Sequence, residues 1–81
     1  MFGERKRTYN ELQKLILIAL RTKKLTKNQI YRKTGIRWEV IDRQIVLLKG
    51  RDYVDVFFAH EKMKIYTITN EGLRYLRKLT R

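Results

Sequence analysis

The stretch LTKNQIYRKTGI, residues 25–36, decides the fold. Thr26 is followed three residues later by Gln29, and this pair forms a capping box at the start of a helix. Gly35 then breaks the helical pattern, and the apolar residue Ile36 lies just beyond it. The stretch therefore predicts a short helix that runs through about Thr34 and ends in a tight turn.

A longer helix is expected directly after this turn, from about Arg37 to Lys49. Ile41, Ile45 and Leu48 are spaced by four and three residues, so they lie along one narrow apolar stripe. The stripe predicts that one face of this helix is buried and that the opposite face is exposed. Gly50 follows as the residue expected to end the helix.

The preceding segment predicts another helix, which begins at Thr8 with a second capping box to Glu11. Its core-facing stripe consists of Leu12, Leu15, Ile16, Ala19 and Leu20. Leu17 and Ile18 widen the apolar surface beyond one face, which indicates that this helix is covered on two sides.

Downstream of Gly50 the pattern changes to that of strands. Residues 53–58 and 63–68 are rich in β-branched and aromatic side chains and are separated by the short polar link 59–62, which predicts a β-hairpin. Thr69 then begins a last helix over about 70–80. No proline, Ser/Gly-rich linker or repeat divides the chain, so we expect one domain over residues 8–81, preceded by a basic arm at residues 1–7.

Residues 25–36 resemble the first half of a helix-turn-helix, with Gly35 at the turn. The continuation through residues 35–54 resembles the winged-helix pattern of the MarR and PadR groups of regulators, and YTITNEGL (66–73) resembles their strand-to-last-helix segment. The resemblance runs from about Thr8 to Leu79. It implies an α+β winged helix-turn-helix with three helices, a β-hairpin wing and a C-terminal helix, and a sequence-specific transcription regulator that binds double-stranded DNA.

The chain also resembles the small basic winged helices that archaeal viruses and plasmids encode. It departs from the family pattern at three positions. Tyr31 stands where a small residue usually packs between the two helices of the motif, Arg37 replaces the usual Ser or Asp cap, and Asp52 replaces a glycine before the hairpin.

Charge supports a polyanionic partner. Twenty Lys and Arg residues against eight Asp and Glu residues give a net charge of +12, and no acid lies between Glu11 and Glu39. Such an imbalance favours nucleic acid. The alternative, a solvated thermophilic surface, usually includes compensating glutamates, which are scarce here.

The major groove of DNA admits one α-helix, so the exposed face of the 37–49 helix is expected to read base edges. The predicted base contacts are Arg37, Trp38, Glu39, Asp42, Arg43 and Val46. Arg43 suits guanine O6 and N7, the carboxylates suit cytosine N4, and Val46 suits a thymine methyl. Two alternatives stay open: an ion pair between Arg43 and Glu39, and a place for Trp38 at the edge of the core or as a helix staple.

Other basic residues are expected to contact phosphates from the first helix of the motif and from the hairpin. These residues are Lys27, Arg32, Lys33, His60, Lys62 and Lys64. His60 is equally consistent with an exposed turn residue. Arg5, Lys6 and Arg7 suit a minor groove as well as they suit a solvated tail.

Several classes of function are excluded by composition. The chain has no cysteine and one histidine, which argues against disulfides and metal sites, and it contains no catalytic set or phosphate-binding loop. The longest apolar run, Leu15–Leu20, is too short for a membrane span or a signal peptide. We therefore predict a cytoplasmic protein (host cytoplasm if viral) that is not an enzyme and has no cofactor or small-molecule effector.

An excess of apolar helix surface predicts a homodimer. The residues expected at its interface are Leu17, Ile18, Leu73, Tyr75, Leu76 and Leu79. Two other functions stay open beside the regulator: sequence-independent coating of DNA, which the charge also supports, and binding of a protein or RNA through apolar residues such as Val46, Leu47, Phe57 and Phe58.

Overall fold

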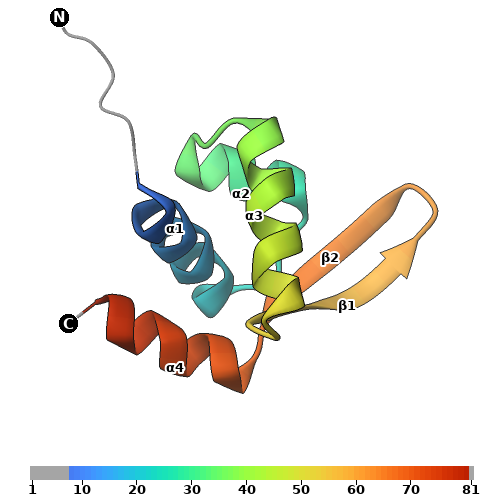
Figure 1. The fold of residues 1–81 in the computed structure, drawn as a ribbon. Helices are drawn as coiled ribbons and strands as arrows, with labels where there is room; N and C mark the ends of the chain where they lie inside the picture. The colour runs from blue at the N-terminus through green and yellow to red at the C-terminus, as the bar shows by residue number, and fades with distance from the viewer. Residues whose placement is uncertain (1–7, 81) are drawn as a thin grey trace, which may run out of the picture.

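The computed structural model describes residues 8–80, in which four helices surround a core and one antiparallel hairpin projects from it (Figure 1). In chain order the elements are α1 (Tyr9–Thr22), α2 (Lys27–Thr34), α3 (Trp38–Gly50), β1 (Val54–His60), β2 (Met63–Ile68) and α4 (Asn70–Leu79). The predicted order of elements is confirmed. The basic arm predicted for residues 1–7 lies outside the described residues.

Threonine side chains begin α1, α2 and α4. The hydroxyls of Thr8, Thr26 and Thr69 each accept a hydrogen bond from the backbone N–H three residues later, at 3.1, 3.2 and 2.9 Å. Glu11 and Gln29 complete the two predicted capping boxes by accepting from the N–H groups of Thr8 and Thr26. Each cap of this kind typically stabilises a helix by about 1 kcal/mol.

The turn between α2 and α3 depends on Gly35. Its φ of 72° lies in the left-handed region, and its N–H donates to the carbonyl oxygen of Tyr31 at 2.8 Å. Thr34 supports the turn because its hydroxyl donates to the carbonyl of Ile30 and accepts from the N–H of Ile36. Helix α3 then begins after Arg37, whose side chain makes no capping bond.

The apolar core contains buried residues from all four helices and from both strands. It includes Ile41, Ile45 and Leu48, so the predicted stripe of α3 is confirmed. Its buried members are Ile16, Leu17, Ala19, Leu20, Leu25, Ile30, Ile36, Ile41, Ile45, Leu48, Val54, Tyr66 and Leu76. Burying one such aliphatic side chain contributes about 1.5–3 kcal/mol before the entropy of ordering is subtracted.

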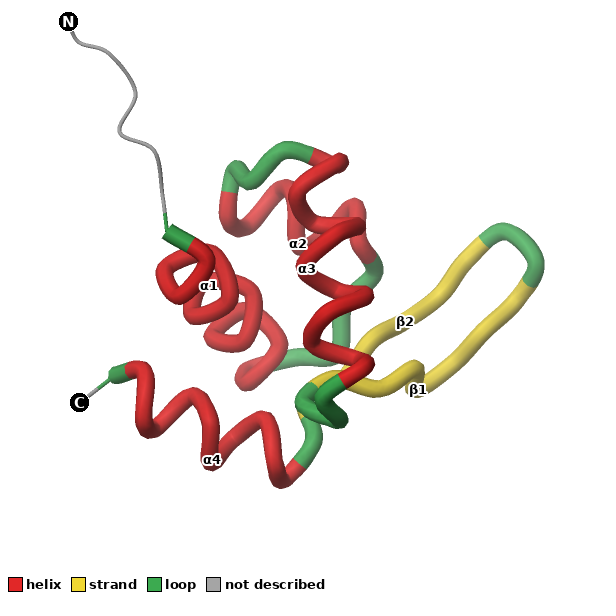
Figure 2. The backbone as a smooth tube through the Cα atoms, in the orientation of Figure 1, coloured by secondary structure: helices red, strands yellow, loops and turns green. Residues whose placement is uncertain are grey.

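This core corrects part of the predicted dimer interface. Leu17 is 0% exposed and Leu76 is 2% exposed, so both pack inside the single chain and offer no surface to a partner. The reason is that α4 folds back against α1, as Figure 2 shows, and covers the second apolar side of α1. The exposed remainder of the predicted interface is therefore smaller than the sequence indicated.

The hairpin is longer and less regular than predicted. Its pairing runs from Val54 opposite Ile68 to His60 opposite Met63, which leaves a two-residue connection in place of the predicted link 59–62. A register shift between Val56 and Phe58 makes Phe57 an extra residue in β1. A bulge of this kind interrupts the alternation of faces.

A third extended segment, which the sequence did not predict, joins the base of the hairpin. Leu25 and Tyr66 form an isolated antiparallel bridge, with N–H···O distances of 3.1 and 2.7 Å. The bridge anchors the hairpin to the loop that precedes α2. It thereby places β2 beside α2.

A buried polar chain connects three helices. The Tyr75 hydroxyl of α4 donates to Gln13 Oε1 of α1 at 2.7 Å, and Gln13 Nε2 donates to Gln44 Oε1 of α3 at 3.0 Å. Gln44 is 1% exposed and lies on the same buried side of α3 as the apolar stripe. Among residues 8–80, no buried side-chain nitrogen or oxygen lacks a hydrogen-bond partner, so these hydrogen bonds link the three helices without leaving an unpaired group.

Candidate nucleic-acid interface

Helix α3 has the two faces that base reading requires. The stripe of Ile41, Ile45 and Leu48 is buried, which fixes the opposite face toward solvent. All six predicted base contacts on or next to this helix are exposed: Arg37, Trp38, Glu39, Asp42, Arg43 and Val46. Their exposure leaves them accessible, while their contact with bases stays a prediction.

Charged residues at the start of α3 pair with each other. An Arg37 guanidinium nitrogen lies 3.6 Å from a carboxylate oxygen of Glu39. The pKa of the Glu39 carboxyl lies below its usual value. The main cause is a hydrogen bond from the backbone N–H of Glu39 to the carboxylate, and the second is the positive charge of Arg37. Arg43 forms no ion pair with Glu39 or with any other of residues 8–80, although its charge also contributes to lowering the pKa of Glu39.

The aromatic residues near this end of α3 face outward. Tyr31 and Trp38 stack with their ring centroids 6.5 Å apart, and both side chains are about two-fifths exposed. Tyr31, where the family pattern has a small residue, thus contacts the first residue of α3 at the surface, whereas Ile30 is the buried residue of α2. Trp38 is not among the residues that pack against the apolar core, and its ring contacts Tyr31 of α2 instead.

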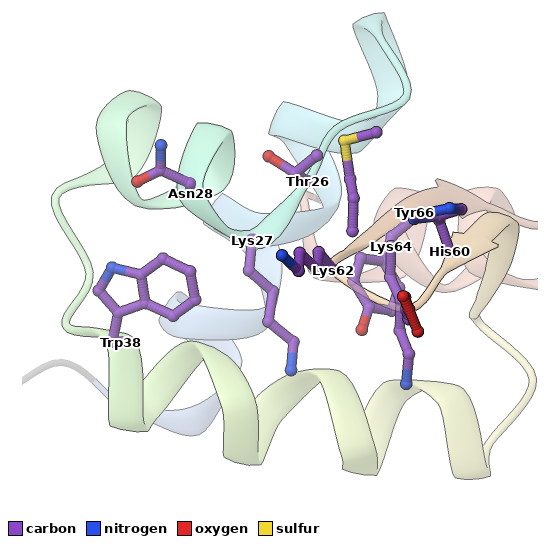
Figure 3. A pocket seen from close by; sticks show the side chains of 10 residues that line it. Thr26, Lys27, Asn28, Trp38, His60, Lys62, Lys64 and Tyr66 are labelled. Atoms are coloured by element: carbon purple, nitrogen blue, oxygen red, sulfur yellow. The ribbon is translucent and has the colours of Figure 1, made fainter.

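A groove of about 530 Å³ separates the starts of α2 and α3 from the end of the hairpin (Figure 3). It is lined by Thr26, Lys27, Asn28, Trp38, His60, Glu61, Lys62, Met63, Lys64 and Tyr66. Three of these are lysines and one is an acid, so the lining carries net positive charge. The groove thus brings together predicted phosphate contacts that are more than thirty residues apart in the sequence.

Lys27 and Asp42, which the sequence assigned to different roles, form one ion pair. Lys27 Nζ lies 2.6 Å from Asp42 Oδ1 and 5.8 Å from the centroid of the Tyr66 ring. Partial burial lowers the pKa of Lys27, but the hydrogen bond to Asp42 and the electrostatic attraction of Tyr66 and Asp42 outweigh it, so the net shift is upward. Figure 3 shows the Lys27 side chain extending from α2 toward α3.

The remaining predicted phosphate contacts are accessible. Arg32 and Lys33 are exposed on α2, and His60, Lys62 and Lys64 are exposed on the hairpin. The sequence reasoning missed Lys24, whose ammonium lies 4.8 Å from the centroid of the Phe57 ring. No local pattern pointed to this contact, because it depends on the bridge that brings residue 25 to β2.

Within residues 8–80, no group of three or more His, Cys, Asp or Glu side chains is arranged to hold a metal ion. None of the helices in that range is both long and apolar enough to cross a membrane.

The arrangement of three helices, a bridge and a hairpin followed by a helix defines a winged helix-turn-helix. No protein-family model matches the sequence, and no curated protein sequence matches it. Solved structures match the fold. BpsR of Bordetella bronchiseptica, whose DNA binding is regulated by 6-hydroxynicotinic acid, has a TM-score of 0.77 and 23% identity, over 96% of this chain and 56% of BpsR.

ZitR of Lactococcus lactis, a zinc-responsive MarR family member, has a TM-score of 0.75 and 16% identity over 96% of this chain and 54% of its own. Its complex with DNA has a TM-score of 0.72 and 16% identity over 96% of this chain and 53% of its own. A MepR mutant of S. aureus has a TM-score of 0.65 and 12% identity over 89% and 53% of the two chains. This chain has the winged-helix fold and spans a little more than half the length of these proteins.

Proposed function

We propose that this protein is a transcription regulator that binds double-stranded DNA in a sequence-specific way. In this proposal the exposed face of α3 enters the major groove, and the hairpin reaches the flanking groove. The observation that carries the proposal is that the exposed face of α3 adjoins the lysine-lined groove. ZitR, which has a similar fold, has been solved in complex with DNA.

The roles within this surface follow from side-chain chemistry. Arg43 forms no ion pair among residues 8–80 and lies on the outward face of α3, so its guanidinium suits paired hydrogen bonds to one guanine. Lys62 lies in the two-residue turn of the hairpin, where its ammonium serves as a flexible point charge for a phosphate. Arg32 and Lys33 lie on α2, which in this motif crosses the DNA backbone.

Selection of bound sequences from a random duplex pool at physiological salt tests the proposal directly. A preferred sequence should emerge. Arg43→Ala should then weaken the preferred duplex far more than a random one, because a bidentate contact carries about 1–3 kcal/mol of discrimination. Lys62→Ala is the matched control and should weaken both duplexes by similar factors.

Sequence-independent coating of DNA is the second candidate, and the net charge of +12 favours it. If selection yields no consensus and Arg43→Ala weakens all duplexes equally, coating replaces the regulator. If the protein does not bind duplex DNA at physiological salt, both DNA-binding hypotheses fail and a protein or RNA partner is the remaining candidate. The exposed Val46, Leu47, Phe57 and Phe58 are the surface for such a partner.

We further propose that the protein acts as a homodimer through α1 and α4. Ile18, Leu73, Tyr75 and Leu79 are half-buried in the single chain and retain apolar surface at these helices. Two recognition helices would then meet half-sites about 10 bp apart, or a multiple of that spacing. Light scattering at micromolar concentration, with and without DNA, measures the mass; a monomer in both conditions contradicts this proposal.

A further inference from the structure

The ion pair between Lys27 and Asp42 lies beside the groove, because Lys27 is one of the residues that line it. It joins the first residue of α2 to the exposed face of α3, and the Nζ–Oδ1 distance is 2.6 Å. Both residues were expected to contact DNA, one at a phosphate and one at a base. The carboxylate occupies one of the three N–H donors of the ammonium and offsets its positive charge, so Lys27 attracts a phosphate less strongly than an unpaired lysine does.

The position of Lys27 explains why it needs a partner. The first turn of α2 contains no acidic residue, and a cation at a helix N-terminus is disfavoured by the positive end of the helix dipole. The carboxylate of Asp42, brought from α3 by the packing of the two helices, supplies the missing negative charge. The Tyr66 ring, whose centroid lies 5.8 Å from the ammonium, adds a further attraction.

The surroundings of the pair contain lysines that have no such partner. Lys62 and Lys64 line the same groove, are exposed, and take part in no ion pair among residues 8–80. The side chain of Lys27 is only 29% exposed, whereas that of Asp42 is 54% exposed. Asp42 is therefore the accessible member of the pair, and Lys27 is the one held inward.

We propose that Asp42 is a positioning residue that holds the charge of Lys27 away from DNA phosphates, and that it does not read a base. This inference rests on the proposed DNA-binding function. It implies that the wild-type protein makes one phosphate contact fewer than its lysines allow, so its affinity for any duplex is lower and less dependent on salt.

The test measures affinity against salt concentration for the preferred and a random duplex, in four proteins: wild type, Asp42→Ala, Lys27→Ala and the double variant. Asp42→Ala should bind both duplexes more tightly and steepen the plot of log affinity against log salt by about 0.9. Between 50 and 200 mM salt, such a change in slope corresponds to about a threefold larger loss of affinity.

The effect of Lys27→Ala in the two backgrounds isolates the pairing. In the wild-type background it should leave the slope unchanged, because Lys27 contacts no phosphate there. In the Asp42→Ala background it should make the slope shallower by about 0.9. Lys62→Ala is the matched control, and it should make the slope shallower by that amount in both backgrounds. Asp42→Asn, which keeps the side-chain shape without the charge, should behave as Asp42→Ala does.

Two results would overturn the inference while leaving DNA binding intact. If Asp42→Ala weakens the preferred duplex alone, Asp42 reads a base. If Lys27→Ala changes the slope equally in both backgrounds, Lys27 contacts a phosphate despite Asp42. If the wild type binds no duplex, the proposed function fails, and this role of Asp42 fails with it; circular dichroism first establishes that each variant is folded.

Discussion

Gly72 offers a sharp test of the packing that joins α4 to the hairpin, because helix propensity and tertiary structure predict opposite signs for Gly72→Ala. Gly72 lies in the first turn of α4 and is buried. In a helix, replacing glycine by alanine ordinarily stabilises a protein by about 0.5–1 kcal/mol. Here we expect a loss of stability.

The magnitude follows from the space around the missing Cβ. A Cβ at Gly72 would lie 2.1 Å from the carbonyl oxygen of Tyr53 and 2.8 Å from Cγ1 of Ile68, whereas real Cβ atoms essentially never approach within 3.0 Å. The start of α4 would have to move by roughly 1 Å, a backbone shift of the kind that costs about 1–3 kcal/mol. That movement also disturbs the hydrogen bonds of Thr69 to Tyr53 (3.0 Å) and to Asp52 (2.6 Å). After the gain in propensity is subtracted, the expected net loss is about 1–2 kcal/mol.

Urea denaturation followed by circular dichroism gives the free energy of unfolding, and a thermal scan should show a midpoint roughly 10 °C lower. Gly50→Ala is the matched control, since Gly50 ends α3 with no atom within 4 Å of its Cβ position. That variant should be as stable as the wild type or slightly more stable. The reasoning is refuted if Gly72→Ala proves as stable as Gly50→Ala.

Three further outcomes are expected. Gln13→Leu should lower the free energy of unfolding by about 1–3 kcal/mol in urea titrations, because it leaves Gln44 without a donor and the Tyr75 hydroxyl without an acceptor; an unchanged midpoint would contradict this. The pKa of Lys27 is raised above 10.5 in the folded state, so the stabilising effect of its pair with Asp42 is fully present below that pH and is lost as pH rises through the folded pKa. The difference in unfolding free energy between the wild type and Lys27→Met should accordingly be constant from about pH 7 to about pH 9 and shrink above 10.5, and a change within that neutral range would count against the pair. Wild-type affinity for duplex DNA should fall with salt at a slope of about −0.9 per phosphate contacted, and a nearly flat plot would point to a protein partner instead.

Local chemistry explains what the sequence predicted correctly. The capping boxes at Thr8 and Thr26 involve residues three apart, so their geometry is independent of the rest of the fold. The stripe of Ile41, Ile45 and Leu48 follows from the helical period alone. The sequence could therefore predict the helix bounds, the turn at Gly35 and the outward face of α3. It could also predict which side chains lie on that outward face.

The pairing of those side chains was decided by the tertiary structure alone. Asp42 lies on an exposed helix face whatever the fold, but only the packing of α2 against α3 brings it to Lys27. Gln44 lies in the core and meets Gln13, although a pattern that counts apolar residues does not mark either as buried. Periodicity records the side of its own helix on which a residue lies. It gives no information on the distance to a residue on another element, and that distance determines whether a charge on this surface is neutralised or stays unpaired.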